Sequence, residues 1–200
     1  MKEGVDYYVQ DGYRVFTAEG HRKRGRCCQS NCRHCPWKHK KKMDTSNMLF
    51  IDMDGVLADF EAKMVELFPE VLDMVPHSDE VRPYADKCQE IPGFYRDLPP
   101  MPGAIDAFHR LRVRYDVWIL SAPSFDNPLS YTEKREWCRE FLGDEHIYKK
   151  LILSNDKGFF SGRALIDDRT KYGVEHFTGE HIHFGQAKFP NWDTVLDYLL

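Results

Sequence analysis

Two aspartates one residue apart follow a short apolar run near residue 50. The run is Leu49-Phe50-Ile51, the acidic pair is Asp52 and Asp54, and Gly55 comes next. An apolar run that stops at charged residues is typical of a buried strand, and α/β proteins bind ligands at the carboxyl ends of parallel strands. The chain must turn at Gly55 to bring both carboxylates to one point. Paired carboxylates need a shared proton or a cation, and Mg²⁺ prefers oxygen ligands, so the segment predicts a magnesium site with a carboxylate nucleophile.

A second acidic pair occurs in the same context. The apolar run Ala164-Leu165-Ile166 ends at Asp167 and Asp168. An Asp-Gly pair alone could be an ordinary solvated turn, but two apolar runs that both end in carboxylates argue against coincidence. Between them, a third apolar run ends at Ser121, and Lys157 follows a fourth. Hydroxyl, ammonium and carboxylate groups are therefore expected together at one edge of a sheet.

The order of these motifs resembles the haloacid dehalogenase (HAD) superfamily of phosphotransferases and, within it, the 5'(3')-deoxyribonucleotidase family. The resemblance rests on Asp-Met-Asp-Gly-Val-Leu-Ala-Asp-Phe at 52–60, Leu-Pro-Pro-Met-Pro-Gly-Ala at 98–104 and Leu-Ile-Asp-Asp-Arg at 165–169. It runs from about Met48 to the C-terminus and leaves the first forty-odd residues unexplained.

The resemblance implies a role for each acidic residue. Asp52 would attack phosphorus and form an aspartyl-phosphate, while Asp54 would protonate the leaving alkoxide and then deprotonate water. Asp52, Asp167 and the backbone carbonyl of Asp54 would hold Mg²⁺. Asp168 would orient Lys157 or bind the metal through water, and Arg169 would pair with an acidic neighbour.

The resemblance also implies phosphate contacts by Ser121, Lys157 and Lys134. Two of them have a structural alternative: Ser121 could be a strand-end turn residue, and Lys134 lies in an amphipathic helix at 132–142 whose polar face would carry a lysine in any case. Ala122 stands where some relatives carry a second hydroxyl, which leaves one phosphate hydrogen bond in doubt.

The spacing of apolar segments predicts an α/β fold: a HAD-like, Rossmannoid parallel sheet with helices on both faces. The expected strands lie near 48–52, 116–120, 150–153, 164–166 and 181–184, and the expected helices near 103–114, 131–142, 170–177 and 191–199. The stretch at about 60–100 interrupts this alternation. It predicts a small helical cap inserted after the first motif.

Aromatic residues in and beside this cap predict a pocket for a nucleobase. Phe60, Phe94 and Tyr95 match positions where relatives line the base pocket, whereas Phe68 and Tyr84 fit the interior of the cap. We therefore expect an Mg²⁺-dependent phosphatase that hydrolyses (deoxy)ribonucleoside monophosphates to nucleoside and phosphate. The alternatives are another phosphomonoester, such as a sugar phosphate or a nucleic-acid 3'-phosphate end, or a metal- or nucleic-acid-binding adaptor.

Charge divides the chain unevenly. Residues 1–42 carry a net charge of +7 and residues 43–200 a net charge of −11, which give −4 for all 200 residues. This asymmetry predicts a basic module at 1–42 joined to a phosphatase domain at 43–200. No apolar run approaches the ~18 residues of a membrane span, and no export pattern is visible, so we expect a cytoplasmic protein without membrane contact.

The basic module contains a cluster of cysteines. Cys27, Cys28, Cys32 and Cys35 follow a predicted hairpin at 6–17, and clustered thiols in a cytoplasmic chain favour Zn²⁺ or an iron–sulfur cluster. Because adjacent cysteines do not easily reach one tetrahedral ion, three of the four, or His34 in place of one, would ligate. Reduced thiols without metal are the alternative.

The cysteine segment resembles a small bacterial cysteine-rich domain family of unknown function, which implies no activity. The isolated Cys88 and Cys138 are expected to be ordinary buried thiols. The run at 38–42 reads as a linker. Together with Trp37 and the basic residues at 22–24, it could also contact nucleic-acid phosphates.

Overall fold

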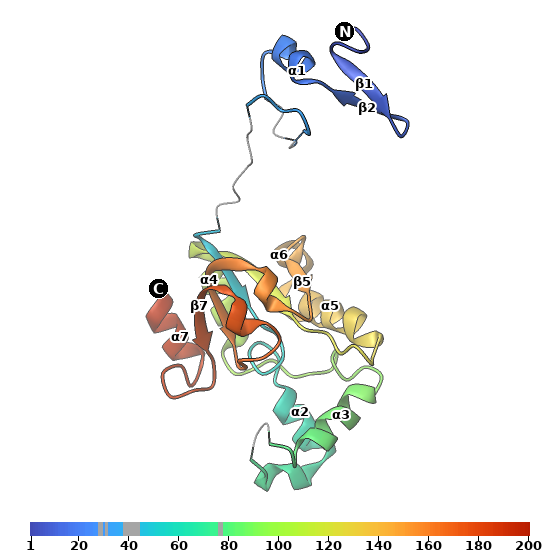
Figure 1. Cartoon of the computed structure of the whole chain (residues 1–200). Coiled ribbons are helices and arrows are strands. Elements are labelled where there is room, and N and C mark those ends of the chain that lie inside the picture. The colour runs from blue at the N-terminus through green and yellow to red at the C-terminus, as the bar shows by residue number, and fades with distance from the viewer. Residues whose placement is uncertain (28–29, 31, 38–44, 76–77) are drawn as a thin grey trace. The chain divides into compact units, whose positions relative to one another are not determined.

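A computed structural model describes residues 1–27, 30, 32–37, 45–75 and 78–200. The chain divides into two compact units, Met1–Asp44 and Thr45–Leu200 (Figure 1), which we call the head and the catalytic unit. The predicted linker at 38–42 and Cys28 lie outside the described residues. In the described part of the chain, none of the helices combines the length and the apolar character that crossing a membrane requires.

The catalytic unit is built on one sheet of five parallel strands in the order β5-β4-β3-β6-β7, which confirms the predicted parallel sheet. The strands are β3 (Met48–Ile51), β4 (Asp116–Ser121), β5 (Leu151–Leu153), β6 (Ser161–Asp167) and β7 (Thr178–His183). Every residue of β3 is buried, as its apolar sequence predicts. Ile51 pairs with Ile119 of β4 and Ile166 of β6, so these three strands end at the same level.

The two faces of the sheet are covered differently. On one face, α4 (Ala104–Arg114), α5 (Leu129–Leu142) and α7 (Trp192–Leu199) pack on alternate strand residues such as Leu49 and Ile51. On the other, Phe50 and its neighbours pack under segments that hold two short 3-10 helices, η2 (Lys157–Phe159) and η3 (Val174–His176). The short helix α6 (Asp144–Ile147) follows α5. The larger core therefore lies on the α-helical face.

The predicted helix at 170–177 is wrong, because this segment forms only the three-residue η3. Tyr172 and Gly173 have φ angles of 59° and 81°, which an α-helix cannot contain. A Cβ at Gly173 would lie 1.9 Å from the carboxylate Oδ1 of Asp156, so the chain turns tightly here against the segment before Lys157. Local packing overrides the helical pattern of the sequence.

The predicted cap is confirmed as a helical insertion between β3 and α4. It contains α2 (Phe60–Leu67), the 3-10 helix η1 (Pro69–Asp73) and α3 (Arg82–Glu90), and Figure 1 shows α2 and α3 together, away from the sheet. Its two ends meet: the Asp59 N–H donates to Pro99 O (2.7 Å), and the Met101 N–H donates to Leu57 O (2.8 Å). The insertion therefore leaves and re-enters the core at one place.

The head contains the predicted hairpin, β1 (Tyr7–Gln10) paired antiparallel with β2 (Tyr13–Phe16). The two turn residues, Asp11 and Gly12, have φ angles of 52° and 78°, as a tight two-residue hairpin turn requires. Helix α1 (Ala18–Arg24) follows, and the Thr17 hydroxyl caps it by accepting from the Gly20 N–H (3.1 Å).

Candidate active site at the carboxyl ends of the strands

The chain turns at Gly55 after β3, as the sequence predicts, but the carboxylates of Asp52 and Asp54 have different partners and do not meet at one point. Asp52 continues the ladder through its N–H, which donates to Ile166 O (2.9 Å). Gly55 has a φ of 75°, and its N–H closes the turn on Ala58 O (2.8 Å). A Cβ at Gly55 would lie 2.6 Å from Asp168 Oδ2. Glycine thus allows both the turn and the close approach of the second acidic pair to the first.

Three carboxylates converge at this point. Asp52, Asp167 and Asp168 each offer an oxygen, and these oxygens lie within 4.8 Å of one another. Burial, followed by the charge of Asp52, raises the pKa of Asp167 to about 6 and that of Asp168 to about 7. The cluster thus holds more buried negative charge than nearby cations balance. An oxygen-only set of this kind fits a hard divalent cation.

Lys157 enters this cluster from η2. Its side chain is 3% exposed, its Nζ lies 3.0 Å from Asp52 Oδ1, and it donates a short hydrogen bond to Asp167 Oδ2. Burial alone would lower the pKa of Lys157, but the charges of Asp52 and Asp167 and their hydrogen bonds raise it instead. Lys157 therefore stays protonated and can offer positive charge to a bound anion.

Asp54 faces a different partner. Its Oδ2 accepts a hydrogen bond from Lys134 Nζ (2.6 Å), and the same ammonium donates to Ser121 Oγ (3.1 Å). The Lys134 side chain is fully buried and comes from α5, while Ser121 ends β4. Asp54 Oδ1 is buried and has no hydrogen-bond partner among the described residues. The structure thus brings Asp54, Ser121 and Lys134 together and leaves one carboxylate oxygen of Asp54 available.

Glu133, next to Lys134, links α5 to the end of the cap, a role that the sequence did not predict. Its buried carboxylate accepts hydrogen bonds from the N–H groups of Gly93 (Oε1, 2.6 Å) and Tyr95 (Oε2, 3.1 Å). One turn later, Trp137 Nε1 donates to Leu98 O (2.8 Å). Helix α5 therefore positions the Lys134 ammonium and also holds the segment by which the cap returns to the core. A Glu-Lys pair on a helix gives no sequence signal for such distant contacts.

Two histidine rings on β7 contact the backbone of the second acidic pair, Asp167 and Asp168. His181 Nε2 lies 3.2 Å from Asp167 O and His183 Nε2 lies 3.0 Å from Asp168 O. Because a carbonyl oxygen only accepts, each Nε2 carries the hydrogen. The rings stack with centroids 5.0 Å apart. Their i, i+2 spacing indicates a shared strand face, which was the available signal in the sequence.

The three aromatic residues predicted for the base pocket are neighbours. The Phe60 ring lies 4.9 Å from the Phe94 ring and 6.4 Å from the Tyr95 ring, centroid to centroid. Phe94 and Tyr95 are buried, whereas Phe60 is partly exposed at the start of α2. Lys134 Nζ lies 4.7 Å from the centroid of the Tyr95 ring, so the aromatic group adjoins the site. Phe60 is the only one of the three that is partly exposed.

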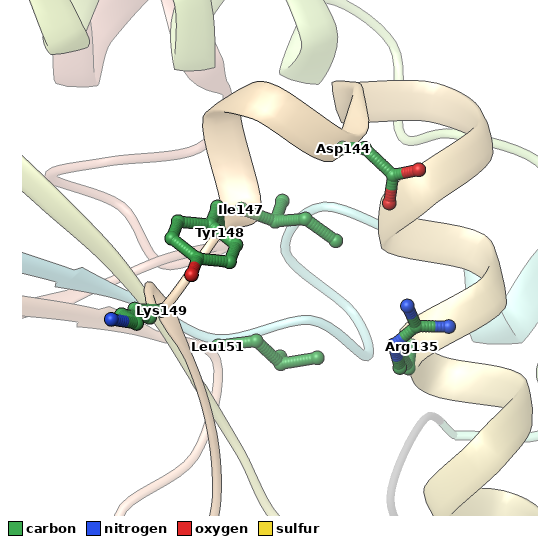
Figure 2. Close-up of a pocket in the computed structure, with 6 residues that line it drawn as sticks. All are labelled: Arg135, Asp144, Ile147, Tyr148, Lys149 and Leu151. Carbon is green, nitrogen blue, oxygen red and sulfur yellow. The ribbon is translucent and has the colours of Figure 1, made fainter.

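A separate surface pocket of about 450 Å³ lies at α5, α6 and the start of β5 (Figure 2). Figure 2 shows Asp144 and Arg135 on one side of it and Tyr148 and Lys149 on the other. Leu151, which begins β5, also lines it, so the pocket adjoins the amino end of that strand, whereas Asp52, Ser121 and Asp167 lie at carboxyl ends. This pocket is therefore not the candidate active site.

Comparisons with known proteins identify what the chain is similar to. The sequence profile of the family described as 5' nucleotidase, deoxy (pyrimidine), cytosolic type C protein matches residues 46–193, and a family of unknown function (DUF5522) matches residues 1–41. A Vibrio phage KVP40 protein, provisionally named 5'(3')-deoxyribonucleotidase, is 43% identical over 80% of this chain and 87% of its own length. The human 5'(3')-deoxyribonucleotidase, cytosolic type, is 32% identical over 77% of this chain and 81% of its own length.

A solved HAD-hydrolase structure from Bacillus subtilis, bound to magnesium, aligns with a TM-score of 0.45 at 12% identity and covers 73% of this chain and 90% of that one.

Proposed function

This chain belongs to the 5' nucleotidase, deoxy (pyrimidine), cytosolic type C family of HAD-type phosphomonoester hydrolases, and from that membership we propose that it hydrolyses deoxyribonucleoside monophosphates with Mg²⁺ as cofactor. The products are a nucleoside and inorganic phosphate. The named relatives support the substrate class, and the convergence of three carboxylates supports the cation.

One observation carries the assignment of roles: Asp52 and Asp54 are two residues apart but have different partners. Asp52 lies with Lys157 among the three carboxylates that would hold the cation, while Asp54 is held by Lys134 through a single oxygen. Two carboxylates in different environments can serve as nucleophile and as acid. We assign the nucleophile to Asp52 and the general acid and base to Asp54.

In the first step, a carboxylate oxygen of Asp52 attacks phosphorus, and the bond from phosphorus to the 5'-oxygen of the nucleotide breaks. Asp54, protonated through Oδ1, gives its proton to the departing alkoxide. Ser121 and Lys134 donate to the phosphoryl oxygens from the β4 side, and Lys157 supplies positive charge from the other side. These donors are already buried, so little reorganisation accompanies the reaction.

In the second step, water attacks the phosphorus of the aspartyl-phosphate and gives its proton to Asp54, and the bond between phosphorus and Asp52 breaks. Mg²⁺, held by Asp52, Asp167 and the backbone carbonyl of Asp54 with Asp168 close by, would neutralise charge on the phosphoryl oxygens. The ring Nε2–H groups of His181 and His183 donate to the backbone carbonyls of Asp167 and Asp168. These bonds hold the backbone that carries the two carboxylates.

The cap provides the contacts that distinguish a nucleotide from other phosphate esters. Phe60 begins α2 directly after the first motif and presents a partly exposed ring. Stacking on an aromatic face favours any nucleobase and does not depend on hydrogen bonds to the base edge. It therefore suits an enzyme that accepts several nucleotides. Phe94 and Tyr95 support that ring from within the cap.

A substrate panel tests the proposal. Phosphate release should be measured with Mg²⁺ for deoxyribonucleoside monophosphates, ribonucleoside monophosphates, sugar phosphates, an aryl phosphate and a 3'-phosphorylated oligonucleotide. We expect the highest kcat/KM for deoxyribonucleoside monophosphates and no turnover in excess EDTA. Higher kcat/KM for a sugar phosphate or an oligonucleotide end would overturn the substrate class, and full activity in EDTA would overturn the cation.

A further inference from the structure

The head has an unusual interior for a folded unit. Among its described residues the buried ones are Asp6, Gly20 and His21, and no apolar side chain of residues 1–27, 30 and 32–37 is buried. A unit of about forty residues buries too little apolar surface to be stable alone, and natural domains of this size add disulfides or a metal. His21 is 2% exposed, and its Nε2 has no hydrogen-bond partner among the described residues. The head therefore requires a stabilising group other than a hydrophobic core.

Polar contacts hold the first half of the head. The Asp6 carboxylate accepts from Lys23 Nζ (2.6 Å) and from the Lys2 N–H (2.7 Å). A Cβ at Gly20 would lie 2.0 Å from Asp6 O, which shows how closely α1 packs on the chain before β1. These contacts organise residues 2–24, and they do not include the cysteine segment.

Arg33 and His34 of the cysteine segment contact the hairpin. His34 Nε2 lies 3.0 Å from the Tyr8 hydroxyl, and Arg33 donates to Gln10 Oε1 (2.6 Å). The segment also turns on itself, because the Cys35 N–H donates to Cys32 O (3.1 Å). Such polar contacts at a partly exposed surface each contribute little stability.

Two sulfurs of this segment have a spacing that suits a shared metal ion. Cys27 Sγ and Cys35 Sγ lie 3.7 Å apart. They are not bonded to each other, since a disulfide needs about 2.05 Å. Two thiolates on one tetrahedral zinc ion, each about 2.3 Å from the metal, lie about 3.8 Å apart. The observed separation therefore matches the edge of a tetrahedral zinc site.

We propose that the head binds one structural Zn²⁺ through the thiolates of Cys27, Cys32 and Cys35. Cys27 and Cys35 are assigned from the distance between their sulfurs. No three ligand atoms of the head's described residues lie within 4.8 Å of one another, so Cys32 is assigned instead from the Cys-x-x-Cys turn that it shares with Cys35. The site takes a soft, tetrahedral cation, in contrast to the oxygen cluster of the catalytic unit. The zinc replaces the missing hydrophobic core as the group around which the head folds.

The test uses the full chain, purified without chelators and analysed for metals. We expect about one zinc ion per chain, as a single structural site requires. Cys27→Ser and Cys35→Ser should each lose most of it, while Cys88→Ala, which removes a buried thiol of α3, should retain it. Titration of the wild-type chain with an organomercurial should release the zinc to a colorimetric chelator, which separates thiolate-bound metal from metal on the carboxylates.

A second measurement covers the case in which a variant fails to fold. Zinc removal from the wild-type chain should expose the Lys and Arg sites between residues 14 and 33 to trypsin, and added Zn²⁺ should restore their protection. The proposal is overturned by a wild-type chain that neither contains nor takes up zinc, by unchanged zinc in both serine variants, or by iron with acid-labile sulfide in place of zinc.

Discussion

The catalytic end of the sheet and the head hold reactive side chains by opposite means. Asp52, Ser121 and Asp167 lie at the carboxyl ends of three adjacent strands whose apolar residues other than Trp118 are buried, so the sheet fixes their positions before any ligand binds. Cys27 and Cys35 lie outside regular elements, in a unit with no buried apolar side chain among its described residues. A site of the first kind is preformed, whereas a site of the second kind forms together with its ligand.

The largest effect should come from Asp52→Asn, in the preformed site. An amide neither attacks phosphorus nor carries the charge that the cation needs, so we expect kcat on a nucleotide to fall at least ~10³–10⁴-fold with little change in thermal stability. Asp54→Asn should lose the ~10²–10⁴-fold of a removed general acid. Phosphate release and a melting curve measure both. Near-normal activity in Asp52→Asn would contradict the covalent mechanism.

Lys157→Met should be the most destabilising single change in the site. It leaves two buried carboxylates without their cation, which costs roughly 3–5 kcal/mol of unfolding free energy in EDTA. Urea denaturation measures this loss, and Mg²⁺ should restore part of it because the cation replaces the missing charge. Lys63→Met is the matched control, since its pair with Glu66 lies at the surface of the cap and should contribute less than about 1 kcal/mol. Equal losses would mean that the cluster is not preformed.

Phe60→Ala separates recognition from chemistry. If the ring stacks on a base, kcat/KM for a nucleotide should fall by roughly 1–3 kcal/mol of transition-state binding, while hydrolysis of a small aryl phosphate stays nearly unchanged. Parallel assays of the two substrates decide the matter. Equal losses on both would show that Phe60 supports the cap and does not bind substrate.

Glu133→Gln loosens the cap without touching the phosphate contacts. The amide keeps one acceptor and loses the charge-assisted bonds to the N–H groups of Gly93 and Tyr95, so we expect a loss of about 1–3 kcal/mol in stability. We also expect a larger change in KM for a nucleotide than for an aryl phosphate. The exposed Glu140→Gln on the same helix should change neither quantity. A fall in kcat alone would instead place Glu133 with Lys134 in the chemistry.

Deletion of residues 1–42 should have the smallest effect. Because the catalytic unit has its own core and sheet, kcat on a nucleotide should stay within roughly twofold of the full chain. The truncated chain should also lose the zinc that elemental analysis finds in the full chain. An insoluble or inactive truncated protein would mean that the head is an integral part of the fold and that the predicted boundary is wrong.

Local patterns predicted the strands of the sheet, the cap and the hairpin, because apolar runs, Gly55 and the Asp11-Gly12 turn leave a direct mark in the sequence. The helix at 170–177 was wrong because Gly173 adopts a positive φ to pack on Asp156, a contact that no local pattern shows. Glu133 was missed for a related reason: its partners are 38 and 40 residues away in the chain. The roles of the site residues remain predictions, since placement alone does not test them.

The joined ends of the cap have a consequence for how such enzymes can change. Because residues 59 and 99 are linked by a backbone hydrogen bond, the insertion leaves and re-enters the catalytic fold at one place, and α5 holds its returning segment through Glu133 and Trp137. Its length and sequence can vary without altering the register of any strand. Laboratory recombination could therefore exchange residues 61–92 for those of a relative and transfer substrate preference, while residues 93–98 keep their contacts with α5 beside the phosphate site.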